Sequence, residues 1–167
     1  MGTIIRSPVK LLAIFLILGC VNSGMKITSP SFENNGAIPE RFTCDGKDVN
    51  PKLMISEIPG SAKTLALIMD DPDAPMGTWV HWVMWNIPPG NIPENSTPGT
   101  QGLNSWGRKR YGGPCPPSGV HHYFFKVYAL DCRLNLPEGA TKEDLLKAME
   151  GHIIEKAELI GTYQRSS

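Results

Sequence analysis

The sequence predicts an all-β domain, mainly antiparallel, with one helix near the C-terminus. Seventeen glycines and fifteen prolines are scattered among short apolar runs, a composition that favours many strands joined by turns over a helical bundle. In the clearest of these runs the apolar side chains alternate with a period of two. The 167 residues suffice for one domain with a core and are too few for two ordinary ones.

The charge of the chain is balanced, with 16 basic and 16 acidic residues. A chain without an excess of positive charge has no overall field to attract the phosphates of a nucleic acid. Nucleic-acid binding is therefore not expected.

The N-terminal segment resembles an export signal. Basic residues precede an uncharged apolar run, residues 11–19, which ends at Cys20. The run is shorter than the roughly 20 apolar residues of a membrane-spanning helix. We expect residues 1–19 to be a signal peptide of lipoprotein type, with Cys20 acylated, so that an exported protein meets the membrane only through this lipid. The alternative is a cytoplasmic protein whose translation starts at Met25; in both cases residues 25–167 form a single domain.

Strands are expected in six segments. Three carry the strongest pattern, because they are rich in β-branched and aromatic residues and are bounded by Pro, Gly, Asn or Asp. These are residues 63–71, 78–87 and 120–130. Weaker strand patterns occupy residues 27–32, 53–58 and 157–163.

One helix is expected late in the chain. Thr141 and Asp144 have the spacing of a capping box, which marks a helix N-terminus. An apolar stripe with helical spacing follows, at Leu145, Leu146, Met149, Ile153 and Ile154. We expect the helix to continue to the end of this stripe, although Gly151 weakens it.

Alternation along the first strong strand separates two aspartates. Asp71 continues the buried row of Leu65, Leu67 and Met69, and Asp70 lies on the other face. Residues 78–87 are apolar on both faces, which predicts a strand covered on both sides. His81 then lies inside, flanked on its own face by Trp79 and Val83.

The third strong strand adds further polar groups to the interior. His121 and Tyr123 share the inward face, and His122 and Lys126 point outward. A buried charge without a partner costs several kcal/mol of lost hydration, so the buried carboxylate and imidazoles are expected to pair with one another. Three strand ends that each deliver such groups predict one shared site.

The turn after the first strong strand, "DDPDAP" at residues 70–75, is stiffened by two prolines. Its Asp73 is expected to accept hydrogen bonds from nearby backbone N–H groups. A rigid turn of this kind can hold acidic groups at the mouth of a pocket, with Pro75 at its end.

Residues 88–119 connect two strands over a far greater length than the ~4–6 residues of a typical connection. Gly112 and Gly113 lie in this loop, and we expect their backbone N–H groups to approach an anion. The basic residues 108–110 just before them could attract that anion.

Cysteine pairing stays open. If Cys20 is lipidated, Cys44, Cys115 and Cys132 remain, which permits at most one internal disulfide; three inert thiols are the alternative. No Cys-x-x-Cys spacing is present, so neither a thiol redox motif nor a zinc knuckle is indicated.

Four stretches together resemble the phosphatidylethanolamine-binding protein family, also called the Raf kinase inhibitor protein family, and within it the bacterial and archaeal YbhB/YbcL-like branch. They are "DDPDAP", "GTWVHWVMWNIP", "GRKRYGGPCPPSGVHHYFFKVYALD" and "MEGHIIEKAELIGTYQR". The resemblance covers about residues 27–165. It implies two antiparallel sheets in a Greek-key-like arrangement with a C-terminal helix.

The resemblance also implies an anion pocket. It assigns pocket roles to Asp71, His81, Gly113, His121 and Tyr123, with Pro75 shaping the rim. Where the family often has His-Arg-Tyr, this chain has His-His-Tyr at residues 121–123. Because the middle residue points outward, the pocket is expected to be retained.

The function expected from these residues is binding, without catalysis or cofactor, of a phosphate-bearing head group such as phosphoethanolamine. Asp71 would orient the imidazole of His81 or His121 and raise its pKa, and Tyr123 and the Gly113 N–H would complete the donors. Asp71 or Asp73 would meet the ammonium group.

Several alternatives remain open. One is inhibition of a protein target, a protease or a kinase, through the Pro/Gly-rich loop. Another is a metal-dependent hydrolase that uses Asp71, His81 and His121 as ligands. Pairing of two copies through an edge strand would give a homodimer.

Overall fold

The computed structural model describes residues 24–166. The predicted signal peptide and the lipidation of Cys20 lie outside the described residues. None of the helices within residues 24–166 combines the length and apolar character needed to cross a membrane.

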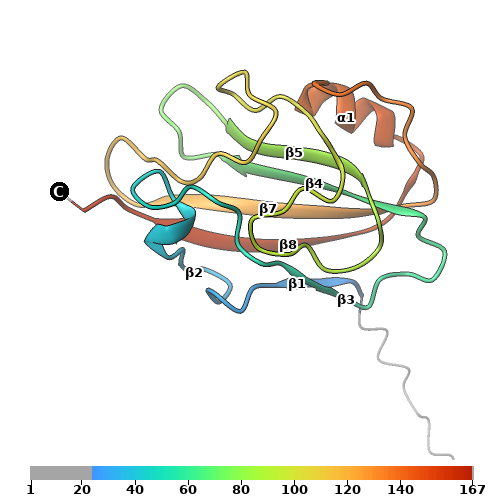
Figure 1. Cartoon of the computed structure of the whole chain (residues 1–167), viewed down its shortest axis with the longest axis horizontal. Coiled ribbons are helices and arrows are strands. Elements are labelled where there is room, and N and C mark those ends of the chain that lie inside the picture. The colour runs from blue at the N-terminus through green and yellow to red at the C-terminus, as the bar shows by residue number, and fades with distance from the viewer. Residues whose placement is uncertain (1–23, 167) are drawn as a thin grey trace, which may run out of the picture.

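A six-stranded sheet forms the centre of the molecule (Figure 1). Its order is β2-β8-β7-β4-β5-β6, and all neighbours are antiparallel except β2 and β8. The strands are β2 (Gly36–Ala37), β4 (Thr64–Asp71), β5 (Trp79–Ile87), β6 (Thr100–Gln101), β7 (His121–Leu130) and β8 (Ile153–Tyr163). A second antiparallel sheet contains β1 (Lys26–Thr28) and β3 (Met54–Ser56), and a short 3₁₀ helix, η1, spans Glu40–Phe42. The predicted fold class, all-β in two sheets with one C-terminal helix, is confirmed.

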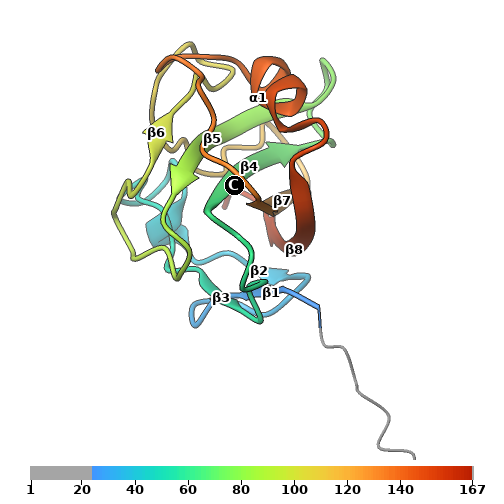
Figure 2. The ribbon, with the colours of Figure 1, turned by 90° about the vertical axis from the view of Figure 1, so that its right-hand side faces the viewer.

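The large sheet is covered on both faces, which explains why every residue of β4 is buried. Figure 2 shows α1 (Lys142–Met149) and the β1–β3 pair on opposite sides of the central strands. Leu65, Leu67 and Met69 enter the core on the β1–β3 side, whereas Ala66 and Ile68 pack in the core that includes the helix. The two-sided burial predicted for β5 is likewise confirmed.

The helix begins as predicted and ends earlier. The Thr141 side chain accepts from the Asp144 N–H, and the Asp144 side chain accepts from the Thr141 N–H, so the capping box is present. The helix ends at Met149, because Gly151 takes a left-handed φ of 78° that no helix can continue through. The expectation of a helix to Ile154 is wrong; Ile153 and Ile154 begin β8, four residues before the predicted start of that strand.

The loop between β5 and β7 is held in place by the rest of the protein. It crosses in front of β4 and β7 in Figure 1 and contributes β6 at the sheet edge. A disulfide joins its Cys115 to Cys44, which follows η1, and Cys132 is free. The disulfide resolves one of the alternatives that the sequence left open.

Candidate functional site

A cavity of about 330 Å³ lies at one end of the central strands β4, β5 and β7. Because β4 runs antiparallel to β5 and β7, the end of β4 lies beside the starts of both neighbours. Asp71 ends β4, His81 lies near the start of β5 and His121 begins β7, and all three line the cavity. The structure therefore brings the predicted carboxylate and both imidazoles to one site.

Asp71 and His121 form a buried pair. The His121 Nδ1–H donates to Asp71 Oδ2 at 2.7 Å, and the two side chains are only 8% and 5% exposed. Asp71 Oδ1 accepts the Asp73 N–H at 2.8 Å, which closes the turn that follows β4. The predicted orienting role of Asp71 thus falls on His121, whose Nε2 has no hydrogen-bond partner among residues 24–166.

His81 reaches the cavity because of a bulge in β5. Met69 pairs with Trp82 and Asp70 with Val80, so His81 is an extra residue between them. The extra residue reverses the alternation and puts His81 on the cavity side, where Trp79 also lies. The prediction that His81 and Val83 share a face of the strand is wrong, because Val83 packs in the core on the helix side.

The environment of His81 favours the neutral form of its imidazole. Its Nδ1–H donates to the Gly112 carbonyl at 2.7 Å, and in the described part of the chain Nε2 has no hydrogen-bond partner. Burial lowers the pKa of His81, and the hydrogen bond to Gly112 opposes this only in part. The prediction that an imidazole pKa is raised is therefore wrong for His81.

The backbone N–H groups of the two loop glycines are already engaged within the protein. The Gly112 N–H donates to the His81 carbonyl at 3.0 Å, and the Gly113 N–H donates to Asp48 Oδ1 at 2.6 Å. Neither glycine lines the cavity, but both line a smaller hollow beside it. A Cβ on Gly113 would meet the Phe42 carbonyl oxygen and Asp48. Close packing therefore explains why residue 113 is a glycine, and the expected anion contact is not the reason.

Tyr123 lies behind His81 and outside the cavity wall. The two rings are perpendicular, with centroids 5.1 Å apart. The hydroxyl is buried, and among the described residues it has no hydrogen-bond partner. Burial raises its pKa, so the group stays a neutral phenol. Its predicted contact with a ligand is not supported by this position.

The remaining predicted residues belong to the turn after β4. Pro75 lines the cavity, as expected for a rim residue. Asp73 does not: its Oδ2 accepts the N–H of His122 at 2.8 Å and the His122 Nδ1–H at 2.7 Å. The hydrogen bond from the His122 side chain lowers the pKa of Asp73. Asp73 thus accepts a backbone N–H, as predicted, and His122 points away from the core as predicted.

Several parts of the cavity wall were not predicted from the sequence, among them Trp106 and the disulfide of Cys115. Trp106, from the long loop, packs edge-on against Trp79 and His81, with centroids 5.4 and 5.1 Å away. Cys115 brings its disulfide to the wall. The available signal for Trp106 was a large aromatic side chain within a loop; nothing in the spacing identified the partner of Cys115.

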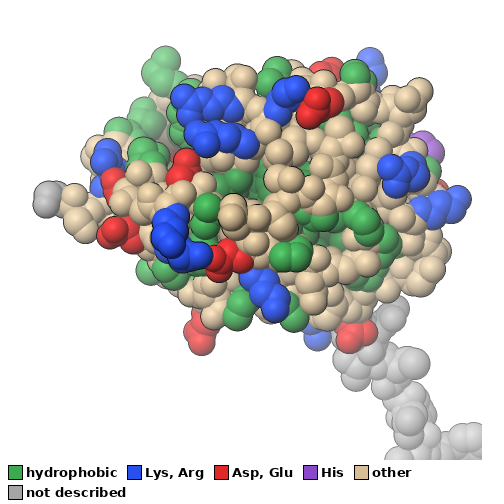
Figure 3. Space-filling model, in the orientation of Figure 1, with side chains coloured by type: hydrophobic (Ala, Val, Ile, Leu, Met, Phe, Trp, Pro, Cys, Tyr) green, Lys and Arg blue, Asp and Glu red, His purple; other side chains and the backbone are tan. Residues whose placement is uncertain are grey.

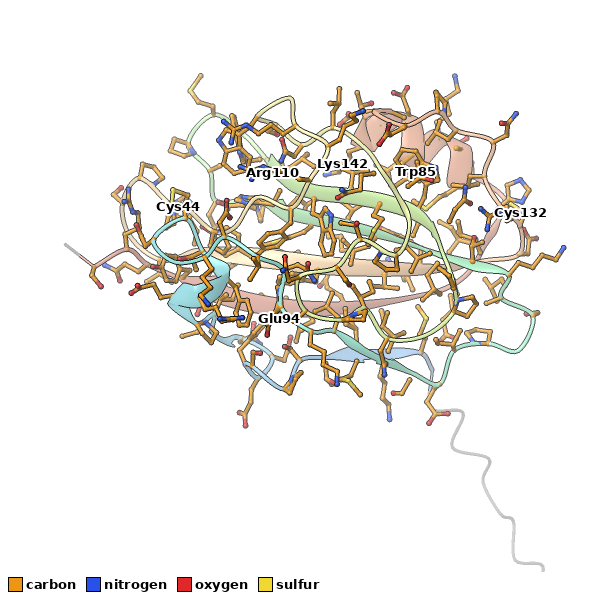
Figure 4. All side chains as sticks on the ribbon, viewed as in Figure 1. Cys44, Trp85, Glu94, Arg110, Cys132 and Lys142 are labelled. Carbon is orange, nitrogen blue, oxygen red and sulfur yellow. A yellow bond between two sulfur atoms is a disulfide. The ribbon has the colours of Figure 1, made fainter. Side chains whose placement is uncertain are left out.

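A smaller hollow of about 140 Å³ adjoins the cavity and shares Trp106 and Cys115 with it. Arg108 and Arg110 line this hollow, and the Arg110 guanidinium lies 3.9 Å from Asp48. Basic side chains gather in Figure 3 over the region where Figure 4 labels Arg110. Positive charge thus lies beside the cavity rather than inside it.

Comparison with known proteins gives a consistent result. The family model described as phosphatidylethanolamine-binding protein matches residues 28–164. A UPF0098 protein of Methanothermobacter thermautotrophicus is 50% identical over 153 residues, which cover 84% of this chain and 99% of that protein. One from Pyrococcus abyssi is 51% identical over 171 residues, covering 92% of this chain and 96% of the relative.

Solved structures agree with the sequence comparisons. A crystal structure described as a putative phosphatidylethanolamine-binding protein homolog from Chlamydia trachomatis superposes with a TM-score of 0.83 at 44% identity, over 86% of this chain and 99% of that one. The Escherichia coli protein YbcL, described as a new member of the mammalian family, gives a TM-score of 0.78 at 29% identity, over 86% and 100% of the two chains.

Proposed function

This chain belongs to the phosphatidylethanolamine-binding protein family, and from that premise we propose that it is a binding protein, not an enzyme, whose cavity takes a small phosphate-bearing head group such as phosphoethanolamine. The supporting observation is the pair of imidazoles in the cavity wall. His81 and His121 each use Nδ1 within the protein and keep Nε2 for a ligand.

The size of the cavity suits a small ligand. Its volume of about 330 Å³ lies at the low end of the roughly 300–1,000 Å³ of small-molecule sites. Its wall is largely aromatic and proline-rich, with Trp79, Trp106 and Pro75 around the three polar side chains. Such a wall excludes water and strengthens the few hydrogen bonds that fix the orientation of a ligand.

Recognition of the phosphate would depend on a proton shared between an imidazole Nε2 and a phosphate oxygen. With the proton of a neutral imidazole on Nδ1, Nε2 accepts a hydrogen bond from a protonated phosphate oxygen. If a proton enters with a fully ionised phosphate, Nε2 becomes a charged donor instead. Arg108 and Arg110 in the adjacent hollow would draw the anion toward the opening.

The rest of the wall suits the positive end of a zwitterion. Asp71 places a carboxylate in the cavity, and each of its oxygens has capacity for a further hydrogen bond. The faces of Trp79 and Trp106 can attract an ammonium group through cation–π contacts. A ligand that carries both charges would therefore be preferred over inorganic phosphate.

The alternatives raised by the sequence have less support. Among the described residues, Asp71, His81 and His121 are not a set whose ligand atoms all lie within 4.8 Å of one another, as a metal-dependent hydrolase would need. Inhibition of a protease or kinase, formation of a homodimer, and export to the cell envelope stay predictions.

Titration calorimetry with phosphoethanolamine tests the proposal. We expect His81→Ala and His121→Ala each to weaken binding by about tenfold or more, since a hydrogen bond to a charged group is worth about 1.5–3 kcal/mol. His122→Ala is the matched control, because His122 is next in sequence and points to solvent. The proposal is wrong if the wild-type chain does not bind phosphoethanolamine, or if both cavity variants bind as tightly as the control.

A further inference from the structure

We propose that Asp131, Cys132 and His152 form a binding site for a zinc-type divalent transition metal ion. The carboxylate oxygen, the thiol sulfur and the imidazole nitrogen all lie within 4.8 Å of one another. Within residues 24–166, this is the only group of three His, Cys, Asp or Glu side chains whose ligand atoms lie so close to one another. The site is separate from the cavity and does not depend on the function proposed for it.

The fold builds the site where two paired strands meet α1. β7 ends at Leu130 and β8 begins at Ile153, and these two residues face each other in the sheet. The residues just beyond the ends therefore lie side by side, and the Asp131 N–H donates to the His152 carbonyl at 3.1 Å. His152 follows Cys132 by 20 positions in sequence, which is why no short metal motif is visible.

Each ligand residue is held by a further contact. The Thr64 hydroxyl at the start of β4 donates to the Cys132 carbonyl at 2.6 Å. The His152 N–H donates to the Met149 carbonyl at the end of α1 at 3.0 Å, and the His152 imidazole already pairs with Asp131 at 2.9 Å. These contacts hold the backbone of Cys132 and His152 in place, so closure of the site on an ion would depend on side-chain rotation.

The site is open to solvent. The Asp131 and His152 side chains are 54% and 46% exposed, and Cys132 is half-buried. Figure 4 labels Cys132 at the end of the molecule opposite Cys44, whose disulfide partner lines the cavity. An ion can reach these ligands without passing the cavity.

The donor set is suited to zinc. Thiolate, imidazole and carboxylate are the three ligand types of protein zinc sites, with bonds of about 2.0–2.3 Å. A tetrahedron with such bonds separates its ligand atoms by roughly 3.5 Å, so the 4.8 Å cluster has to close by only about 1 Å. The fourth position would be left to water.

Charge is also favourable. On binding, the ion replaces the thiol proton, so the thiolate and the carboxylate together neutralise a divalent cation. Lys63 lies near Asp131 and Cys132 and opposes the cation, which limits the affinity without removing a ligand. The thiolate distinguishes the site from an acidic cluster, since it favours zinc-type ions over magnesium or calcium.

The chain contains a natural comparison. Asp73 and His122 form a pair with the same geometry, 2.7 Å apart and with the His and Asp side chains 48% and 42% exposed. Within the described residues, no thiol lies close enough to that pair to form a set of three ligands. A histidine variant there removes an exposed imidazole without touching the proposed site.

The test is a titration of the full, untagged chain with Co²⁺, followed by displacement with Zn²⁺. We expect a thiolate-to-cobalt charge-transfer band and tetrahedral visible bands, saturating at one ion per chain. Cys132→Ser should abolish the charge-transfer band. His152→Gln should weaken Zn²⁺ binding by more than about tenfold, since even the outer partners of a metal are worth about 10–100-fold in affinity.

The controls separate this site from other ligands. Cys20→Ser and His122→Gln should leave both the band and the Zn²⁺ affinity unchanged, and a thermal unfolding curve shows that each variant is folded. A wild-type chain without the thiolate band would overturn the proposal. So would a folded Cys132→Ser variant that keeps the band, or a folded His152→Gln variant that keeps the wild-type Zn²⁺ affinity.

Discussion

At the scale of single residues, His81 carries a pH dependence of stability. Burial lowers its pKa below the ordinary 6.5, so the unfolded chain binds a proton at this residue more readily than the folded chain does. The stability that the neutral imidazole contributes is therefore complete above pH 6.5. It is lost progressively as the pH falls from 6.5 through the folded-state pKa.

Urea unfolding of the wild type and of His81→Asn measures this dependence. The asparagine can still donate to the Gly112 carbonyl but does not titrate. Between about pH 7.5 and about pH 5, the wild type should lose free energy of unfolding relative to the variant. A difference that stays constant over this range would contradict the argument.

The residues of the site differ in how well sequence alone could place them. Asp71 was predictable, because it continues a buried row of alternating side chains and a buried carboxylate needs a partner. The role of Gly113 was not, because it depends on Asp48 and Phe42, 65 or more residues away in sequence. Local spacing predicts which face a side chain takes; it does not predict which distant atoms meet it.

At the scale of elements, irregularities account for most of what alternation missed. In β5, one extra residue at His81 moves the imidazole from the helix side of the sheet to the cavity side. At the end of α1, the positive φ of Gly151 separates an apolar stripe into a helix and a strand. Regular patterns gave the number and type of the long elements correctly, and the breaks within them required the tertiary structure.

The loop between β5 and β7 supplies a prediction at this scale. It packs against η1 through the Cys44–Cys115 disulfide, which joins residues 71 positions apart. Closing a loop of that length removes conformational entropy from the unfolded chain worth about 4 kcal/mol. We expect Cys44→Ala/Cys115→Ala to lower the free energy of unfolding by about this amount in urea titrations.

Loss of the free thiol is the control for this prediction. Cys132→Ala removes a half-buried sulfur and no cross-link, so it should cost far less than the double variant. A double variant within about 1 kcal/mol of the wild type would show that the cross-link does not restrict the unfolded chain as the entropy argument requires.

At the scale of the whole molecule, the large sheet separates two regions of different chemistry. β7 begins at His121 in the cavity and ends beside the Asp131–Cys132–His152 cluster. A ten-residue strand spans roughly 30 Å, so the two sites share the sheet as a rigid support and have no side chain in common. Substitutions at one site should leave ligand affinity at the other unchanged.

The helix layer is joined to the sheet by a buried carboxylate. Asp70, on the face of β4 opposite Asp71, is 1% exposed and accepts from two cations: Lys126 Nζ of β7 at 2.9 Å and Lys142 Nζ of α1 at 2.6 Å. The arrangement links a central strand, its neighbour and the helix. Asp70 thus lies away from the cavity, on the face that the alternation predicts.

Asp70→Asn tests how much this link contributes. Removing one partner of a buried ion pair costs about 3–5 kcal/mol when the remaining charge stays buried. Here the lysine side chains are 30% and 18% exposed and can partly regain solvent, so we expect a loss of about 2–3 kcal/mol in free energy of unfolding. Glu138→Gln removes the exposed pair with Lys109 and should cost less than about 1 kcal/mol. Equal losses in the two variants would mean that the burial of Asp70 adds nothing, and that the helix is held to the sheet by its apolar contacts alone.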